Sequence, residues 1–111
     1  MFKRWAVVML GMFLFFLTVS VALAVDGATV YAKCKGCHGT DGKGNPKMAE
    51  LLKITLAQLD VTKPETQKKD DALLRKLTKE GVGKMKGLGD KLKDDEISAV
   101  VAHLRTLAKG K

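Results

Sequence analysis

The chain has 111 residues, two cysteines and a formal net charge of +8. This length predicts one domain. The charge does not indicate a nucleic-acid-binding protein, because acidic residues are interleaved with the lysines. Trp5 and all four phenylalanines lie near the N-terminus, and Tyr31 is the only Phe, Tyr or Trp in residues 25–111. That segment therefore has little apolar mass for a core and needs an additional stabilising group.

Residues 1–24 have the pattern of a secretory signal peptide. Two basic residues precede an uncharged, mostly apolar run at residues 6–24, which ends in an Ala-Leu-Ala cleavage pattern. We predict cleavage after residue 24, a mature domain at residues 25–111, and a periplasmic location. The alternative is an uncleaved anchor that tethers the domain to the inner membrane, because the 19-residue run approaches the length that spans a bilayer.

A short helix is expected at residues 27–32, with Asp26 as its N-cap. Gly27 and Tyr31 are four positions apart and share one face of this helix. A glycine on that face suits close packing against a second helix. The helix leads directly into the most informative motif of the chain.

Cys34, Cys37 and His38 form the motif Cys-x-x-Cys-His, the attachment signature of a c-type haem. Positions i, i+3 and i+4 share one face of a helical turn, so both thiols and the imidazole would point at one flat ring. Gly36 would let that ring lie close to the backbone. The thiols would form thioethers, and His38 would bind the iron. A cysteine pair alone also fits a disulfide, a redox dithiol or half of a zinc site, but the adjacent histidine favours haem.

Residues 39–46 have turn chemistry and predict a loop on the proximal side of the haem. A backbone carbonyl near Pro46 is expected to accept the Nδ1–H of His38, which leaves Nε2 for iron. Residues 47–61 fit neither helical nor strand periodicity and predict one short helical turn followed by a loop. Met48 is a candidate sulfur ligand here, although packing is the commoner role of such a methionine.

Residues 62–65 are expected to interrupt regular secondary structure, and residues 67–69 are expected to form a solvated connector. A helix is then predicted from residues 70–71, with acidic residues in its first turn and leucines on one face. Gly81 is expected to end this helix.

Residues 81–90 contain four glycines and predict a loop without a strong helix or strand. Met85 lies in the middle of this polar segment. A thioether is a soft ligand that suits haem iron, so this position indicates an axial ligand. The alternative is a loop methionine that packs on nearby leucines.

The C-terminal segment from Asp94 predicts the clearest helix. Acidic residues stand at its start, basic residues stand toward its end, and apolar residues recur every three or four positions. His103 lies on or near the apolar face. It is a further candidate for the second axial position, although a packed histidine is the commoner case.

The chain resembles the small class I c-type cytochromes over nearly all of residues 25–111. The haem motif is the most specific of three blocks that carry the resemblance. In chain order these blocks are residues 31–44, residues 73–81, and residues 83–85 together with 91–105.

The resemblance implies an all-α fold of three to four helices around one covalently bound haem c with its iron, in which the N- and C-terminal helices cross. It implies Cys34 and Cys37 as thioether attachments, His38 as the proximal ligand and Met85 as the distal ligand. It also implies that Gly27 and Tyr31 meet the C-terminal helix around Val100, His103 and Leu104.

Three positions depart from the family pattern. Lys86 follows Met85 where proline is frequent, which raises the question of what stiffens the ligand loop. His103 stands where an aromatic residue is usual. Lys93 stands where serine or threonine is common, so Asp94 is expected to cap the last helix.

Ligation by both His38 and Met85 would leave iron no open position, so one-electron transfer is predicted and enzymatic activity is not. The alternative is a small-ligand sensor or enzyme in which Met85 does not bind. The predicted carrier is a monomer or a subunit of an oxidoreductase complex in a periplasmic respiratory or dehydrogenase chain. Its expected partners are redox proteins with acidic docking surfaces, which six lysines near the haem motif and Met85 would attract: Lys33, Lys35, Lys84, Lys86, Lys91 and Lys93. The alternative is that these lysines only keep the surface solvated.

Overall fold

The computed structural model describes residues 25–110, so the predicted signal peptide lies outside the described residues. No helix in residues 25–110 is both long and apolar enough to cross a membrane. The elements in chain order are α2 (Gly27–Val30), the 3-10 helix η1 (Tyr31–Lys33), α3 (Lys35–His38), α4 (Pro46–Leu52), α5 (Leu56–Leu59), α6 (Pro64–Gln67), α7 (Asp71–Glu80), β1 (Gly81–Val82), β2 (Met85–Lys86) and α8 (Asp94–Lys109).

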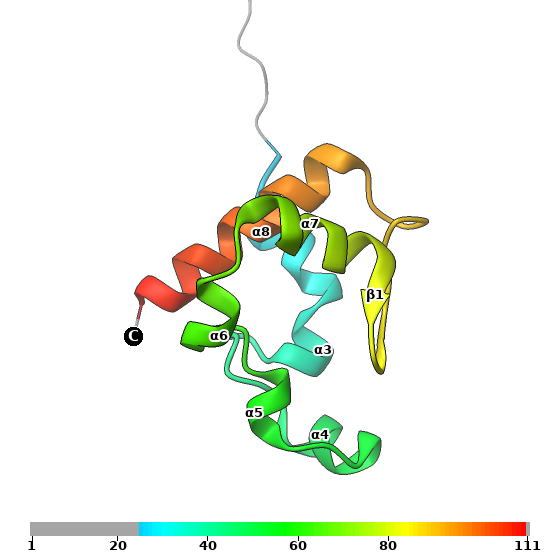
Figure 1. Cartoon of the computed structure of the whole chain (residues 1–111), viewed down its shortest axis with the longest axis vertical. Helices are drawn as coiled ribbons and strands as arrows, with labels where there is room; N and C mark the ends of the chain where they lie inside the picture. Colours follow the sequence, from blue (N-terminus) through cyan, green and yellow to red (C-terminus); the bar gives the residue numbers. More distant parts are fainter. Residues whose placement is uncertain (1–24, 111) are drawn as a thin grey trace, which may run out of the picture.

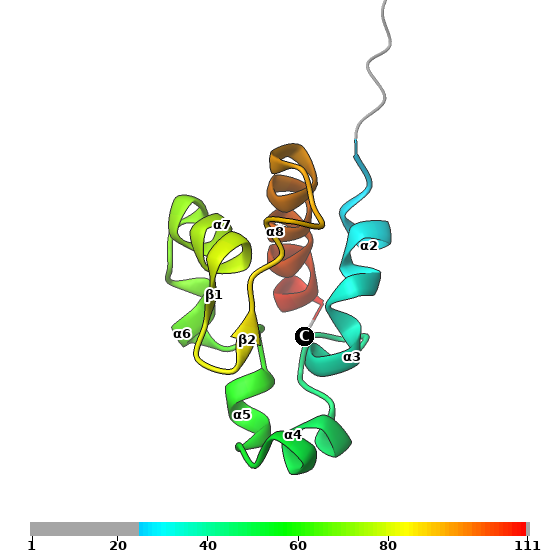
Figure 2. The same cartoon turned by 90° about the vertical axis from the view of Figure 1, so that its right-hand side faces the viewer.

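Three helices in the described part of the chain exceed four residues, namely α4, α7 and α8. Helix α8 lies between α2 and α7 and contacts both (Figure 2). Helices α4 and α5 lie at the opposite end of the molecule from these three (Figure 1). The predicted all-α fold is confirmed, with the addition of one antiparallel hairpin whose two strands are two residues long each.

The N-terminal segment crosses α8 at Gly27 and Tyr31, as the resemblance implied. A Cβ atom on Gly27 would overlap the carbonyl oxygen of Ala99, so glycine is required for this close approach. The Tyr31 and His103 rings pack together, with centroids 5.0 Å apart and planes inclined by 52°. Around this crossing lies the main buried core, formed by Val30, Tyr31, Leu92, Ile97, Val100 and Leu104.

Helix α7 begins and ends where the sequence predicted. The Asp70 carboxylate accepts a hydrogen bond from the Leu73 amide at 2.8 Å, which caps the first turn. Gly81 follows the last helical residue with a φ of +86°, a conformation that favours glycine.

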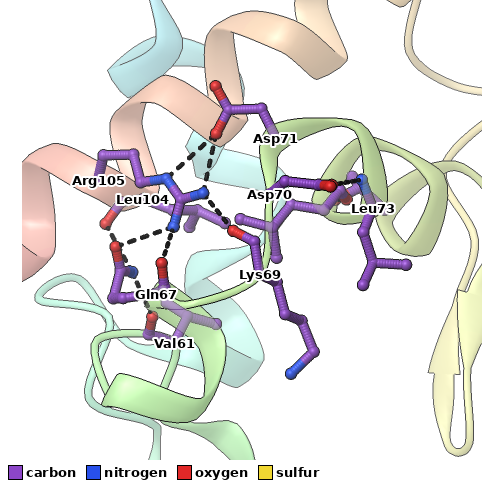
Figure 3. A network of polar contacts seen from close by, with 10 residues as sticks. Val61, Gln67, Lys69, Asp70, Asp71, Leu73, Leu104 and Arg105 are labelled. Carbon is purple, nitrogen blue, oxygen red and sulfur yellow. Dashed lines mark hydrogen bonds and ion pairs between the residues drawn. The ribbon is translucent and has the colours of Figure 1, made fainter.

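The expectation of a solvated connector at residues 67–69 was wrong. Pro64 starts the single turn α6, and the Gln67 side chain is half-buried and donates to the Val61 carbonyl at 2.8 Å. Arg105 of α8 donates to the Gln67 carbonyl at 2.7 Å and to the Lys69 carbonyl at 2.5 Å (Figure 3). The connector is thus tied to α8 by a residue that lies far away in the sequence.

Residues 47–61 contain more helix than the one turn that was expected. The Asn45 side chain accepts from the Lys47 amide at 3.0 Å and Pro46 occupies the first turn, which together start α4. Lys53, in the left-handed region with φ of 58°, ends α4. Polar caps decide these boundaries, which explains why the apolar pattern did not reveal them.

The expectation that Asp94 caps the last helix was also wrong. Lys93 occupies the cap position in extended conformation, and α8 begins at Asp94. The Lys93 amide donates to the Glu96 carboxylate at 2.9 Å. The Glu96 amide, which a serine or threonine cap would bind, instead donates to the Asp95 carboxylate at 2.8 Å.

Candidate haem site

Cys34, Cys37 and His38 lie on one helical turn, as the motif spacing predicted. The His38 amide donates to the Cys34 carbonyl at 3.0 Å, and the Cys37 amide donates to the same oxygen at 3.2 Å. All three residues are half-buried, and both cysteines carry free thiols. Two thiols and an imidazole on one short turn are the donor set that covalent haem attachment needs.

The His38 ring is oriented by the end of α5. Its Nδ1 lies 2.8 Å from the carbonyl oxygen of Leu59, so Nδ1 carries the proton and donates it to that oxygen. The tautomer leaves the Nε2 lone pair for a metal ion. The expected acceptor near Pro46 was wrong, because α5 is only four residues long and its last carbonyls have no intrahelical donors.

The loop after the motif binds the backbone of α3. The Gly44 amide donates to the His38 carbonyl at 2.6 Å, and the Asn45 amide donates to the Cys37 carbonyl at 2.9 Å. The Asn45 side chain also donates to the Gly36 carbonyl at 3.0 Å. Sequence reasoning missed Asn45, although an Asn-Pro pair at a helix start is a signal for a capping residue.

Gly44 permits the close approach of this loop to α5. It has φ of +103°, and a Cβ atom there would lie 2.8 Å from Leu56 Cδ1 and 3.1 Å from Leu59 Cβ. Gly36 differs, because a Cβ atom there would meet no protein atom within 4 Å. The protein backbone therefore does not itself require glycine at position 36.

Met85 lies in β2 of the hairpin and is half-buried. Its cross-strand partner is Val82, in a register that also pairs Gly81 with Lys86. The expected loop is thus a short hairpin, whose two-residue turn begins at Gly83 with the positive φ of +57° that such turns favour.

The other two candidate ligands lie on different elements. Met48 is half-buried on α4, a segment whose end is linked to the hairpin by the Lys84 side chain. His103 packs on Tyr31 where the N-terminal segment crosses α8. The packing role considered for His103 is the one that the structure gives it.

Several large apolar side chains of the described domain are exposed. Exposed large apolar side chains in residues 25–110 come from the N-terminal end, α4, α5, α7 and β1. Leu51 is 71% exposed and Val82 is 55% exposed. The haem fit rests on the donor set of the motif, which is two thiols and the His38 Nε2 lone pair.

Burial alters the acid–base properties beside the motif. It raises the pKa of the Cys34 thiol, with a further contribution from Cys37. Burial also raises the pKa of Tyr31 to about 12, with smaller contributions from Cys34 and Asp41. The neutral Tyr31 hydroxyl donates to the Gly39 carbonyl at 2.7 Å and so links the helix crossing to the loop after the motif.

The family model described as cytochrome c matches residues 24–108 of the chain. The chain belongs to the cytochrome c family. Cytochrome c-552 of Thermus thermophilus is 34% identical to it over 101 residues, which cover 83% of this chain and 67% of that protein. Cytochrome c-553 of Nitratidesulfovibrio vulgaris is 62% identical over 24 residues, or 22% of this chain and 24% of that protein.

A solved structure agrees with this assignment. The KustC0563 c-type cytochrome superposes with a TM-score of 0.61 and 28% sequence identity, over 75% of this chain and 98% of that one. The predicted family, fold and haem c cofactor with its iron are therefore confirmed, and this cytochrome c is an electron-transfer haem protein. The alternative of a haem-free thiol or zinc protein is excluded by the family, in which Cys34 and Cys37 have the spacing of the haem motif.

Proposed function

We propose that this cytochrome c is a periplasmic one-electron carrier with His38 and Met85 as axial ligands, and that Cys34 and Cys37 form its thioethers. The observation that carries the proposal is the 2.8 Å hydrogen bond from His38 Nδ1 to the Leu59 carbonyl. That bond leaves Nε2 as the nitrogen available to iron, in a residue that shares one helical turn with the two cysteines.

Haem c, when bound, supplies reversible one-electron chemistry at iron. The chain contributes orientation of the imidazole through Leu59 and a thioether from the half-buried Met85. With both axial positions filled, no site remains for a substrate or for oxygen, so the protein acts as a carrier and not as an enzyme. A sulfur ligand also raises the reduction potential relative to a second imidazole.

Methionine substitution tests the axial assignment. Met85→Ala should open one axial position, so that the reduced protein binds carbon monoxide and the oxidised protein loses its sulfur-to-iron charge-transfer band. Met48→Ala is the matched control, because Met48 is also a half-buried methionine in the described domain. Carbon monoxide binding by the unaltered protein would instead favour the sensor or enzyme alternative.

The covalent attachment is tested separately. Haem should stain with the protein on a denaturing gel, and Cys37→Ala should reduce the stain strongly because one thioether is lost. Retention of full staining in a Cys34→Ala, Cys37→Ala double variant would exclude the proposed attachment.

Export is the part of the proposal that rests on residues 1–24. N-terminal sequencing of the protein purified from its native cells should begin at residue 25, after removal of the signal peptide. A start at Met1 would show an uncleaved anchor instead and would place the domain at the inner membrane.

Electrostatic docking of acidic redox partners is proposed for a group of exposed lysines beside the haem motif and the Met85 hairpin. Lys84 uses its ammonium group within the protein, so five of the six predicted lysines form this group: Lys33, Lys35, Lys86, Lys91 and Lys93. The electron-transfer rate with an acidic partner should fall as ionic strength rises. A rate independent of salt would mean that these lysines only solvate the surface.

A further inference from the structure

The hairpin that carries Met85 is held at its base by the end of α7. The Leu88 amide donates to the Thr78 carbonyl at 2.9 Å, and the Gly89 amide donates to the Lys79 carbonyl at 3.0 Å. Gly87 packs so closely here that a Cβ atom would overlap the Lys79 carbonyl oxygen. These contacts fix where the hairpin starts and ends but not the direction in which its tip points.

The tip of the hairpin has a second attachment, to a distant element. The Lys84 ammonium group donates to the carbonyl oxygen of Leu52, the last residue of α4, which lies 32 positions earlier. Both views place the hairpin tip next to the segment that contains α4 and α5 (Figures 1 and 2). Of the six lysines that the sequence predicted for docking, Lys84 is the one in the described structure whose ammonium group binds another element.

The acceptor is well suited to an ammonium group. Helix α4 ends at Leu52, so no later residue of the helix supplies an amide to the Leu52 carbonyl. Carbonyls at a helix C-terminus carry partial negative charge and attract cations. A hydrogen bond from a charged donor is stronger than one between neutral groups.

We propose that Lys84 is a positioning residue for Met85, acting as a latch between the hairpin tip and the end of α4. This inference rests on the proposed ligation by Met85, which is the next residue in the chain. Contacts at the base alone would let the hairpin pivot, and the sulfur would then leave the iron more often. The Lys84 contact supplies the restraint that proline supplies where it follows the distal methionine.

Competition with free imidazole measures the latch. Imidazole must displace the methionine sulfur to bind the oxidised iron, so its apparent affinity, followed by loss of the sulfur-to-iron charge-transfer band, reports how firmly Met85 is held. In Lys84→Leu we expect imidazole to bind about tenfold more tightly, which corresponds to ~1.4 kcal/mol at 25 °C. Leucine is chosen over methionine because a new sulfur would compete for the iron.

Two further variants separate the latch from a general charge effect. Lys84→Arg keeps a charged donor and should restore the imidazole affinity of the unaltered protein. Lys86→Leu removes the same charge from strand β2 and should leave that affinity unchanged. The denaturant midpoint from far-UV circular dichroism should stay unchanged in Lys84→Arg and Lys86→Leu, and in Lys84→Leu it should fall by no more than the latch contributes.

The contrary results are distinct from one another. An unchanged imidazole affinity in Lys84→Leu, with the charge-transfer band present, would overturn the latch and leave Met85 ligation intact. Equal effects of Lys84→Leu and Lys86→Leu would also overturn it, in favour of a charge effect. A band that is absent from the unaltered protein would refute Met85 ligation itself.

Discussion

Gly27 shows how one missing side chain sets the distance between two helices. Because a Cβ atom at this position would overlap the Ala99 carbonyl, Gly27→Ala must push α2 away from α8. We expect a loss of about 2 kcal/mol in the free energy of unfolding, measured by denaturant titration. Gly110→Ala is the control, because its Cβ atom would make only ordinary contacts, the nearest at 3.6 Å from the Leu107 carbonyl oxygen. Equal losses in both variants would contradict the role of Gly27.

Tyr31 makes stability depend on pH in the alkaline range. Its pKa of about 12 in the folded protein lies above the ordinary tyrosine pKa of 10.0. The folded state therefore favours the protonated hydroxyl, so this contribution to stability is complete below about pH 10 and is lost as pH rises toward 12. Burial is the largest cause of this shift and would persist with Cys34 as the proposed thioether. We expect the unfolding free energy to fall across this interval.

Tyr31→Phe tests this pH dependence, because phenylalanine has no proton to lose. The variant should lack the part of the decline between pH 10 and 12 that Tyr31 contributes. It should also be less stable at neutral pH, since the bond to the Gly39 carbonyl is removed. Parallel pH profiles for the two proteins would show that Tyr31 is not the titrating group.

At the scale of elements, Arg105 joins α8 to the segment between α6 and α7. Its guanidinium binds the Gln67 and Lys69 carbonyls and forms an ion pair with Asp71 at 2.9 Å (Figure 3). Arg105→Met leaves two carbonyls without their charged donor, so we expect a loss of about 3 kcal/mol in unfolding free energy. The absorption spectrum should not change, because no proposed ligand is touched.

Asp71→Asn is the matched variant for this network. The Asp71 side chain is 59% exposed, so the ion pair alone should contribute no more than about 1 kcal/mol. If Arg105→Met proved no more destabilising than Asp71→Asn, the backbone contacts would contribute little and the network would be an ordinary surface ion pair.

The elements that the sequence predicted well are those whose signals are local. Helices α7 and α8 have apolar periodicity together with charged residues at their ends, all visible within one segment. Helices α4 and α5 were less visible, because polar caps define them better than their mixed apolar pattern does. The two strands of the hairpin are too short, at two residues each, for an alternation of apolar and polar residues to reveal them.

The part of the site that sequence reasoning predicted is the part encoded in one turn, at Cys34, Cys37 and His38. The contacts that orient it come from residues far away in the chain, as in the Leu59 carbonyl that binds His38 and the Leu52 carbonyl that binds Lys84. A backbone carbonyl has no sequence signature, because every residue has one. Such acceptors are found only when the fold brings the elements together.

At the scale of the whole molecule, a small apolar core surrounds the helix crossing and large apolar side chains remain exposed elsewhere. We therefore expect the protein to depend on haem for folding. A Cys34→Ser, Cys37→Ser double variant isolated without haem should show a far-UV circular dichroism spectrum of a largely unfolded chain. Holoprotein-like helix content with a cooperative thermal transition would contradict this expectation.

The central claim is that His38 and Met85 close both faces of the iron and make the protein an electron carrier. The absorption spectrum of the purified holoprotein in both redox states, before and after addition of carbon monoxide, tests this claim most directly. We predict a low-spin oxidised form with a sulfur-to-iron charge-transfer band, and a reduced form whose spectrum carbon monoxide does not change. A high-spin oxidised form, or a carbon monoxide adduct of the reduced form, would contradict the claim.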